Sequence, residues 1–199
     1  MNMNTDIPIY MLDITDSIED DSQVDFIALV DRPAIQRNWN AFNKTQKFEV
    51  TNEDRRIISG AIMLADTPIF RSDNTYGDYY VAFSAETIIK IVQKFFKKGF
   101  QSNVNLMHDS KQQFEGVTLF ESFISDSSRG IMPMKGFEDA PEGSWFGSMI
   151  VENEEAWAKV KSGEIMGFSV EGLFQYKPKE VNQVASLMDA IRKILSQVK

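Results

Sequence analysis

Short apolar segments that end at turn-forming residues constrain the fold of this chain more than any other feature. β-Branched and aromatic residues dominate these segments, and Pro, Gly or Asp bounds them, which is typical of β-strands. Gly116–Asp126 also alternates, with Leu119 and Glu121 on one face and Phe120 on the other. The strands expected from this pattern lie at residues 24–30, 57–65, 79–83, 116–126, 145–151 and 165–176.

Two helices are expected between these strands. One follows Ser84, a suitable N-cap, and ends at Gly99, with an apolar face at helical spacing. The other follows Asn153 and stops at Gly163. The chain has no regular βαβ alternation and no glycine-rich nucleotide loop. The pattern therefore predicts an α+β fold.

Two long segments between these elements carry few regular signals. Residues 34–56 are polar and irregular, and they are expected to form a crossing loop or an arm. Residues 127–144 hold three glycines and two prolines. This second loop either frames a substrate cleft or is mobile.

Composition excludes several classes of function. A length of 199 residues predicts one domain, and 43% hydrophobic residues indicate a globular chain. The net charge of −8 argues against general nucleic-acid binding, which needs clustered Lys and Arg. No apolar stretch approaches the length of a membrane span and no signal peptide is visible, so no membrane association is expected. With one histidine and no cysteine, no metal or other cofactor is expected.

The one histidine is the candidate for acid–base chemistry. His108 lies in Asn105-Leu106-Met107-His108-Asp109, and Ser169 lies in Gly167-Phe168-Ser169-Val170-Glu171-Gly172. A serine hydroxyl needs a base with a pKa near about 6.5 to become a nucleophile, and imidazole supplies it. If the chain performs such chemistry, His108 is the base; a structural histidine is the alternative.

Five segments in this order resemble a known family. They are Leu29–Ile35, Phe83–Thr87, Asn105–Asp109, Glu121–Phe123 and Ser162–Gly172. Together they resemble the XkdF-like phage serine proteases, a branch of the prohead (procapsid) maturation proteases of tailed phages. That wider group is similar in fold to the herpesvirus assemblin proteases, and the resemblance covers roughly residues 24–176.

The resemblance implies a small, mainly antiparallel β-barrel flanked by helices. It divides the chain into an N-terminal extension (1–23), a protease domain (24–176) and a C-terminal amphipathic helix (177–199). It also implies an endopeptidase that works inside the procapsid, in the host cytoplasm. Its substrates would be scaffold protein, the major capsid protein and itself, with Ser169 as nucleophile and His108 as base.

A third residue should orient His108, and assemblin-type enzymes use a second histidine that this chain lacks. A carboxylate is therefore expected. Glu121 is the first choice, since a hairpin would bring its strand beside His108. Asp109 is less suitable because adjacent strand residues face opposite ways. Glu171 shares a face with Ser169 and either takes this role or binds substrate.

Two further readings remain open at this stage. In one, the chain is an inactive capsid-assembly or scaffold-like protein with the same fold. In the other, it is an acidic binding domain.

In the tail, apolar residues recur three and four positions apart: Val184, Leu187, Met188, Ile191, Ile194, Leu195 and Val198. Such a helix either packs back onto the domain, or self-associates or binds scaffold.

Overall fold

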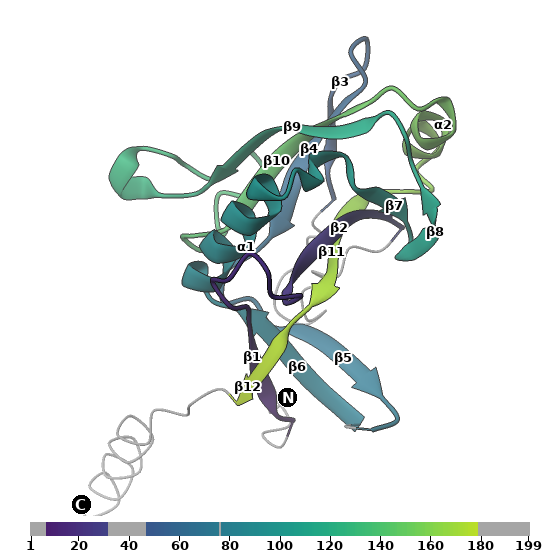
Figure 1. Cartoon of the computed structure of the whole chain (residues 1–199). Helices are drawn as coiled ribbons and strands as arrows, with labels where there is room; N and C mark the ends of the chain where they lie inside the picture. Colours follow the sequence, from purple (N-terminus) through teal and green to yellow (C-terminus); the bar gives the residue numbers. More distant parts are fainter. Residues whose placement is uncertain (1–6, 32–46, 76, 179–199) are drawn as a thin grey trace, which may run out of the picture.

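The computed structural model describes residues 7–31, 47–75 and 77–178 (Figure 1). Within these ranges the chain forms three four-stranded sheets. Sheet A has the order β12 (Gln175–Pro178), β1 (Ile9–Asp13), β6 (Gly77–Phe83), β5 (Ile69–Asp73). Sheet B has the order β11 (Gly167–Leu173), β2 (Gln23–Val30), β7 (Val104–Leu106), β8 (Asp109–Gln113). Sheet C has the order β3 (Glu49–Asn52), β4 (Ile57–Met63), β10 (Trp145–Val151), β9 (Val117–Ile124).

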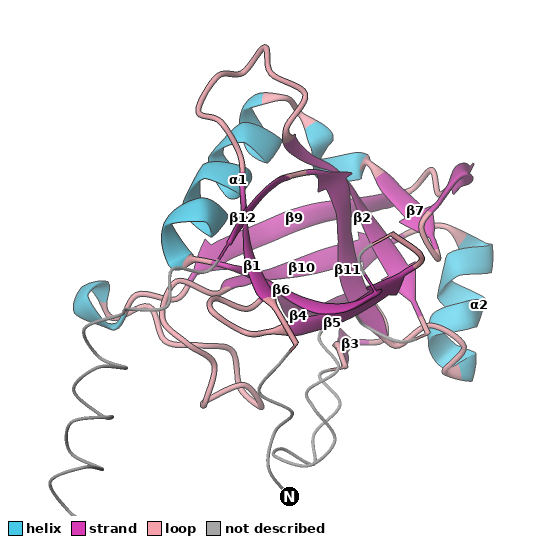
Figure 2. Cartoon of the chain, turned by 90° about the horizontal axis from the view of Figure 1, so that it is seen from below, coloured by secondary structure: helices cyan, strands magenta, loops and turns pink. Residues whose placement is uncertain are grey.

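The described residues contain two α-helices, α1 (Ala85–Lys97) and α2 (Glu154–Ser162), and two short 3₁₀ helices, η1 (Phe100–Ser102) and η2 (Ser127–Arg129). Seen from below, α1 and α2 lie at opposite sides of the strands (Figure 2). Both α-helices begin at the expected caps: the Ser84 Oγ accepts from the Thr87 amide at 3.1 Å, and the Asn153 Oδ1 accepts from the Ala156 amide at 2.9 Å. Local sequence therefore sets where both helices start.

The expected fold class was wrong. The described chain is mostly β, and its three sheets are open rather than closed into a helix-flanked barrel. Sheets A and B also each contain a parallel pair, β1 with β6 and β2 with β7. The physical reason is that the partner of each strand depends on contacts between residues far apart in the sequence. The alternation of side chains along one strand does not determine that partner.

One large core joins the three sheets. Val81 of sheet A, Ile27 of sheet B and Ile58 of sheet C are all buried in it. Phe95 of α1 packs edge-on against Trp145 of β10, with ring centroids 5.6 Å apart. These contacts place α1 against sheet C.

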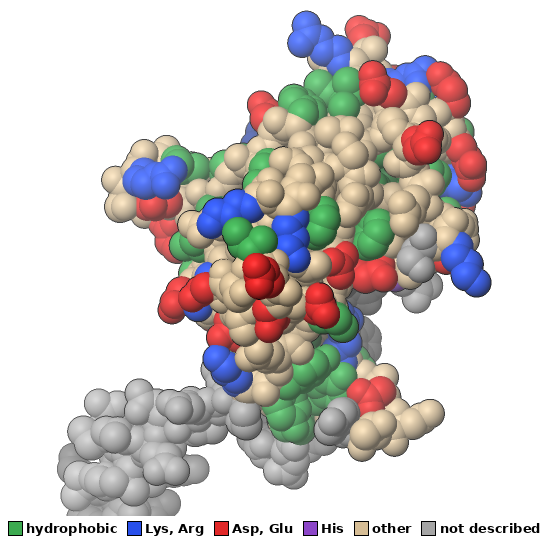
Figure 3. Space-filling model, in the orientation of Figure 1, with side chains coloured by type: hydrophobic (Ala, Val, Ile, Leu, Met, Phe, Trp, Pro, Cys, Tyr) green, Lys and Arg blue, Asp and Glu red, His purple; other side chains and the backbone are tan. Residues whose placement is uncertain are grey.

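Sheet A projects from the lower end of the molecule and includes residues from both ends of the chain. β1 pairs with β12 and β6, so Ile9–Asp13, assigned above to an N-terminal extension, is a strand of this sheet. Tyr10, Tyr79 and Tyr176 contact one another edge-on. Figure 3 shows apolar surface gathered at this end.

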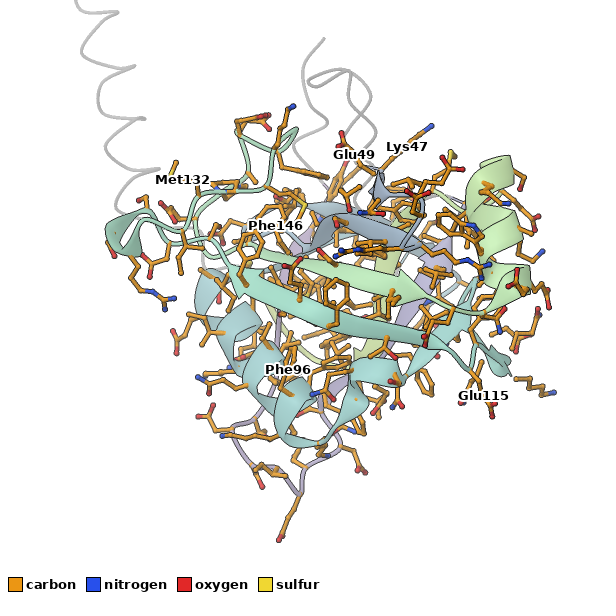
Figure 4. All side chains as sticks on the ribbon, turned by 90° about the horizontal axis from the view of Figure 1, so that it is seen from above. Lys47, Glu49, Phe96, Glu115, Met132 and Phe146 are labelled. Atoms are coloured by element: carbon orange, nitrogen blue, oxygen red, sulfur yellow. The ribbon has the colours of Figure 1, made fainter. Side chains whose placement is uncertain are left out.

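A long connection between β9 and β10, residues 125–144, projects from the side of the molecule; we call it the arm. In Figure 4 the arm is labelled at Met132, which is 63% exposed. At its base, the Phe137 ring packs against Phe146 of β10 at 5.7 Å. The arm coincides with residues 127–144, which were expected to form a long loop.

Neither α-helix of the described ranges has the length and apolar character needed to cross a bilayer.

Candidate active site

Ser169 lies in the middle of β11, on the face of sheet B that points away from the core. Its neighbour Phe168 is 2% exposed and packs on Phe48 at 5.2 Å, so alternation turns Ser169 to the other face. Ser169 pairs with Ala28 of β2, and Ala28 pairs with Asn105 of β7. Ser169 and Asn105 therefore occupy the same level of the sheet, on either side of the small Ala28 side chain.

Two buried atoms at this level lack partners. Within the part of the chain that the structure describes, the Ser169 Oγ and the Asn105 Oδ1 are buried side-chain atoms without a hydrogen-bond partner. Buried polar groups are usually hydrogen-bonded, so an orphaned pair needs an explanation. A catalytic or ligand-binding role is one of the common explanations.

Glu171 lies two residues beyond Ser169 and so on the same face of β11. Its Oε2 accepts a hydrogen bond of 2.7 Å from the Asn105 Nδ2. This contact crosses β2, where Glu171 pairs with Phe26 and Asn105 pairs with Ala28. The carboxylate is thereby held at a fixed position beside β7.

His108 lies at the end of β7, in the two-residue turn that joins β7 to β8. Both turn residues, Met107 and His108, have positive φ values of 50° and 62°. Hairpin turns of this kind usually carry Asn or Gly, and other residues adopt such angles at a cost in free energy. The Met107 amide donates to the Leu29 carbonyl at 3.1 Å, which ties the turn to β2.

This turn places the imidazole beside the carboxylate. The His108 Nδ1 lies 3.7 Å from the Glu171 Oε2, and 42% of the His108 side chain is exposed. The distance is longer than a hydrogen bond, as catalytic contacts often are before substrate binds. Burial lowers the pKa of His108 below its usual range, the charge of Glu171 opposes this shift, and the charge of Arg71 on β5 adds to it.

The structure does not bring Glu121 to this pair. Glu121 lies in β9 on the outer face of sheet C, where its Oε2 accepts a 2.7 Å hydrogen bond from the Ser148 Oγ. The Ser59 Oγ donates to the Ser148 Oγ at 2.9 Å, and Thr51 contacts Ser59 at the same distance. Glu121 therefore ends a row of hydroxyl groups across sheet C, while Glu171 is the carboxylate beside His108.

A small apolar cavity of about 20 Å³ lies next to Ser169, enough for one water molecule. The residues that line it come from all three sheets and the chain that follows β4: Ile62, Met63, Leu64, Ile69, Phe83, Phe168, Ser169 and Val170. The Ser169 hydroxyl is itself buried in this conformation.

β11 is an edge strand of sheet B in the described chain. The Ile27 amide and the Leu29 carbonyl both bond toward β7, so the backbone groups of Ala28 point toward β11. Ser169 therefore bonds toward β2, and the backbone groups of Phe168 and Val170 point outward. On this outer side the Phe48 amide donates to the Met166 carbonyl at 2.9 Å. Among the described residues, no hydrogen bond occupies the edge at Phe168 and Val170.

The sequence pointed to some of these residues and not to others. It singled out His108 and Ser169, and it kept Glu171 only as an alternative. It missed Asn105 and Arg71. The one available signal for Asn105 was a polar residue inside the short apolar segment before His108. No group of three or more His, Cys, Asp or Glu side chains in the described ranges is arranged to hold a metal ion.

A serine, an imidazole and a carboxylate on one sheet face are the chemical groups of a serine hydrolase. Comparison with known proteins gives the same class. The sequence model of a family described as "Putative phage serine protease XkdF" matches residues 45–177, more than half of the chain. The chain belongs to this family. The match includes His108, Ser169 and Glu171.

One curated relative is the phage-like element PBSX protein XkdF of Bacillus subtilis (strain 168). It is 20% identical over 190 residues, which cover 94% of this chain and 60% of the relative. The chain thus spans about three fifths of the relative's length. No solved structure matches the chain.

Proposed function

We propose that the protein is the serine endopeptidase of phage prohead maturation, which cleaves scaffold protein, the major capsid protein and itself inside the procapsid. The observation that carries the proposal is the convergence of Ser169, Glu171, Asn105 and His108 on one face of sheet B. The family to which the chain belongs supports the reaction class. The assignment of capsid and scaffold substrates comes from the resemblance to prohead proteases alone.

In the proposed reaction the Ser169 hydroxyl attacks the carbonyl carbon of the scissile peptide bond. His108 accepts the hydroxyl proton and then delivers it to the leaving amine, and water hydrolyses the acyl-enzyme. Glu171 orients the imidazole and stabilises its cation, in place of the Glu121 expected from sequence. Asn105 is a positioning residue, because it holds the Glu171 carboxylate by its 2.7 Å hydrogen bond.

The outer edge of β11 supports a peptide substrate in particular. An extended peptide that pairs with Phe168 and Val170 would run along the strand that carries Ser169. Main-chain hydrogen bonds would then position the scissile bond with little dependence on substrate side chains. Access needs a rearrangement, because the Ser169 Oγ is buried and the adjacent cavity of about 20 Å³ is too small for a peptide.

The buried hydroxyl also favours a second candidate, an inactive capsid-assembly protein that keeps the fold. Labelling with a fluorophosphonate separates the two, since the reagent reacts only with an activated serine. We expect the full chain to be labelled at Ser169, identified by mass spectrometry, and the label to be absent from Ser169→Ala. The procapsid-assembled protein serves as a second sample, in case assembly opens the site. An absence of label in both samples would support the assembly protein.

The pH dependence of cleavage should identify the third residue. His108 must be neutral to act as a base, so the cleavage rate should rise with pH through the His108 pKa and level off above it. Because burial lowers this pKa, the midpoint should lie below the usual range of histidine. Glu171→Gln removes the charge that opposes the shift, so it should lower the midpoint further and reduce turnover by about 10²- to 10⁴-fold.

Two matched variants make this measurement specific. Arg71→Gln removes a positive charge that lowers the His108 pKa, so it should move the midpoint upward. Glu121→Gln makes the same chemical change as Glu171→Gln on sheet C, and it should leave both midpoint and turnover nearly unchanged. A large loss of turnover in Glu121→Gln, with normal rates in Glu171→Gln, would return the role to Glu121.

A further inference from the structure

A groove of about 550 Å³ lies between α1 and the arm. One wall is the exposed side of α1, with Ala85, Ile89, Val92 and Gln93. The other wall is Ile124 at the end of β9 and the base of the arm, from Ser125 to Arg129 with Glu142 and Gly143. Figures 1 and 4 show the arm projecting on the same side of the molecule as α1.

The groove presents apolar side chains to solvent. Ile89 is 41% exposed although it belongs to an amphipathic helix whose other face is in the core. Exposed apolar surface of this kind, bordered by polar residues, is typical of an interaction site. A cavity between a helix and a loop suits an amphipathic helix, which places apolar residues at three- and four-residue spacing.

We propose that residues 181–199 of the same chain dock in this groove as an amphipathic helix. Their sequence carries the apolar stripe from Val184 to Val198, on otherwise polar positions. These residues lie outside those that the structure describes, so the inference rests on their sequence and on the groove. An isolated helix of this length is marginal in water, and an apolar partner would stabilise it.

The end of β12 lies within reach of the groove. Gln175 pairs with Asp13, and the Thr87 hydroxyl in the first turn of α1 donates to the Asp13 Oδ1 at 3.2 Å. From Gln175 to Pro178 the strand runs about 10 Å further from this point. The six residues from 179 to Val184 span up to about 20 Å, enough for the chain to return to α1.

Charge also favours this segment. Residues 181–199 contain Arg192, Lys193 and Lys199 against Asp189, a net charge of +2 (3 − 1). In the groove, the positive charge of Arg129 is balanced by Asp126, which lies 3.7 Å away. The negative charge of Glu142 is not balanced by another described residue that lines the groove. A basic helix is therefore attracted to the acidic side of the groove, although such surface attraction is modest.

The absence of cysteine from the whole sequence gives a clean cross-linking test. In the full chain, Gln93→Cys in the groove combined with Met188→Cys in the stripe should react with a short bismaleimide to give an internally cross-linked monomer. The matched control is Gln112→Cys on β8 combined with Met188→Cys. Because docking raises the local concentration of the two thiols, we expect at least about ten-fold more internal cross-link in the groove pair.

Other occupants give different results. An equal mixture of the two single variants, Gln93→Cys and Met188→Cys, should give no covalent dimer. Dimer formation would show that the tail of a second copy fills the groove, and equal cross-linking in the control pair would show a tail without a fixed site. Either result would overturn the proposal.

Hydrogen exchange tests the same contact without cysteines. Ile89→Glu should speed amide exchange in residues 181–199 by about ten-fold or more relative to the unchanged chain. Phe120→Glu, at a residue 52% exposed on sheet C, should leave that exchange unchanged. If these amides already exchange at unprotected rates in the unchanged chain, the segment does not dock and the proposal is wrong.

Discussion

Ser169→Ala should lower the turnover of peptide cleavage by about 10⁴- to 10⁶-fold, and His108→Ala should cause a loss in the same range. Ser169→Ala lacks the oxygen that forms the acyl-enzyme, and His108→Ala lacks the only imidazole in the chain. The measurement is processing of co-expressed major capsid protein, followed by initial rates on a peptide that spans the cleavage site. Stability should change little in Ser169→Ala, because the hydroxyl has no hydrogen-bond partner among the described residues to lose.

A matched serine controls for nonspecific effects. Ser148 is also buried in a strand, at 2% exposure, but its hydroxyl bonds to Glu121 and Ser59 on sheet C. Ser148→Ala should therefore lose some stability and keep its activity. Full processing by either Ser169→Ala or His108→Ala would exclude the proposed mechanism.

Strong local signals allowed much of the secondary structure to be predicted. The helix after Ser84 and the strand Trp145–Val151 were predicted from capping residues and from a short apolar run, and both are present. These signals involve residues within a few positions of one another. The strands β1, β3, β5 and β8 were not predicted. Among them, β3, β5 and β8 read EVTN, IFRSD and DSKQQ, with too few apolar residues for an alternating pattern.

The arrangement of the strands could not be predicted in the same way. β2 pairs with β7, which follows it by more than seventy residues, and with β11, which lies farther still along the chain. Nothing in a single strand's sequence specifies such partners. The barrel expected from the resemblance was therefore an inference about pairing, and pairing is where it failed.

The same limit explains the carboxylate. The sequence showed that Glu171 shares a face with Ser169, but not that β2 lies between β11 and β7 and brings Asn105 and the turn at His108 beside Glu171. Glu121 was preferred because a hairpin seemed to bring its strand beside His108. In the structure β8 follows that turn and β9 joins sheet C, so Glu121 meets Ser148 instead. Sheet register decides which carboxylate reaches the imidazole.

Gly172→Ala should lower the free energy of unfolding by about 3 kcal/mol or more. A Cβ at this position would lie 1.9 Å from the Gln23 carbonyl oxygen and 2.8 Å from the Val24 Cα. Both are backbone atoms of β2, so no side-chain rotation relieves the clash and β11 must move. The register of β11 on β2 shifts between Glu171 and Gly172, and the bulge is possible because the second residue lacks a side chain.

Urea unfolding measures this loss, and Gly130→Ala is the control. Gly130 has a φ of 74° with open space around it, so alanine there adds only backbone strain of about 1–2 kcal/mol. If both variants lost a similar free energy of unfolding, the backbone of β2 at Gln23 would have moved to accommodate the added Cβ, and the predicted clash would be wrong.

Since Glu171 immediately precedes the bulge, a displaced β11 should also separate the Glu171 carboxylate from Asn105 and His108. Gly172→Ala should therefore lose activity even under conditions where it stays folded, whereas Gly130→Ala should not.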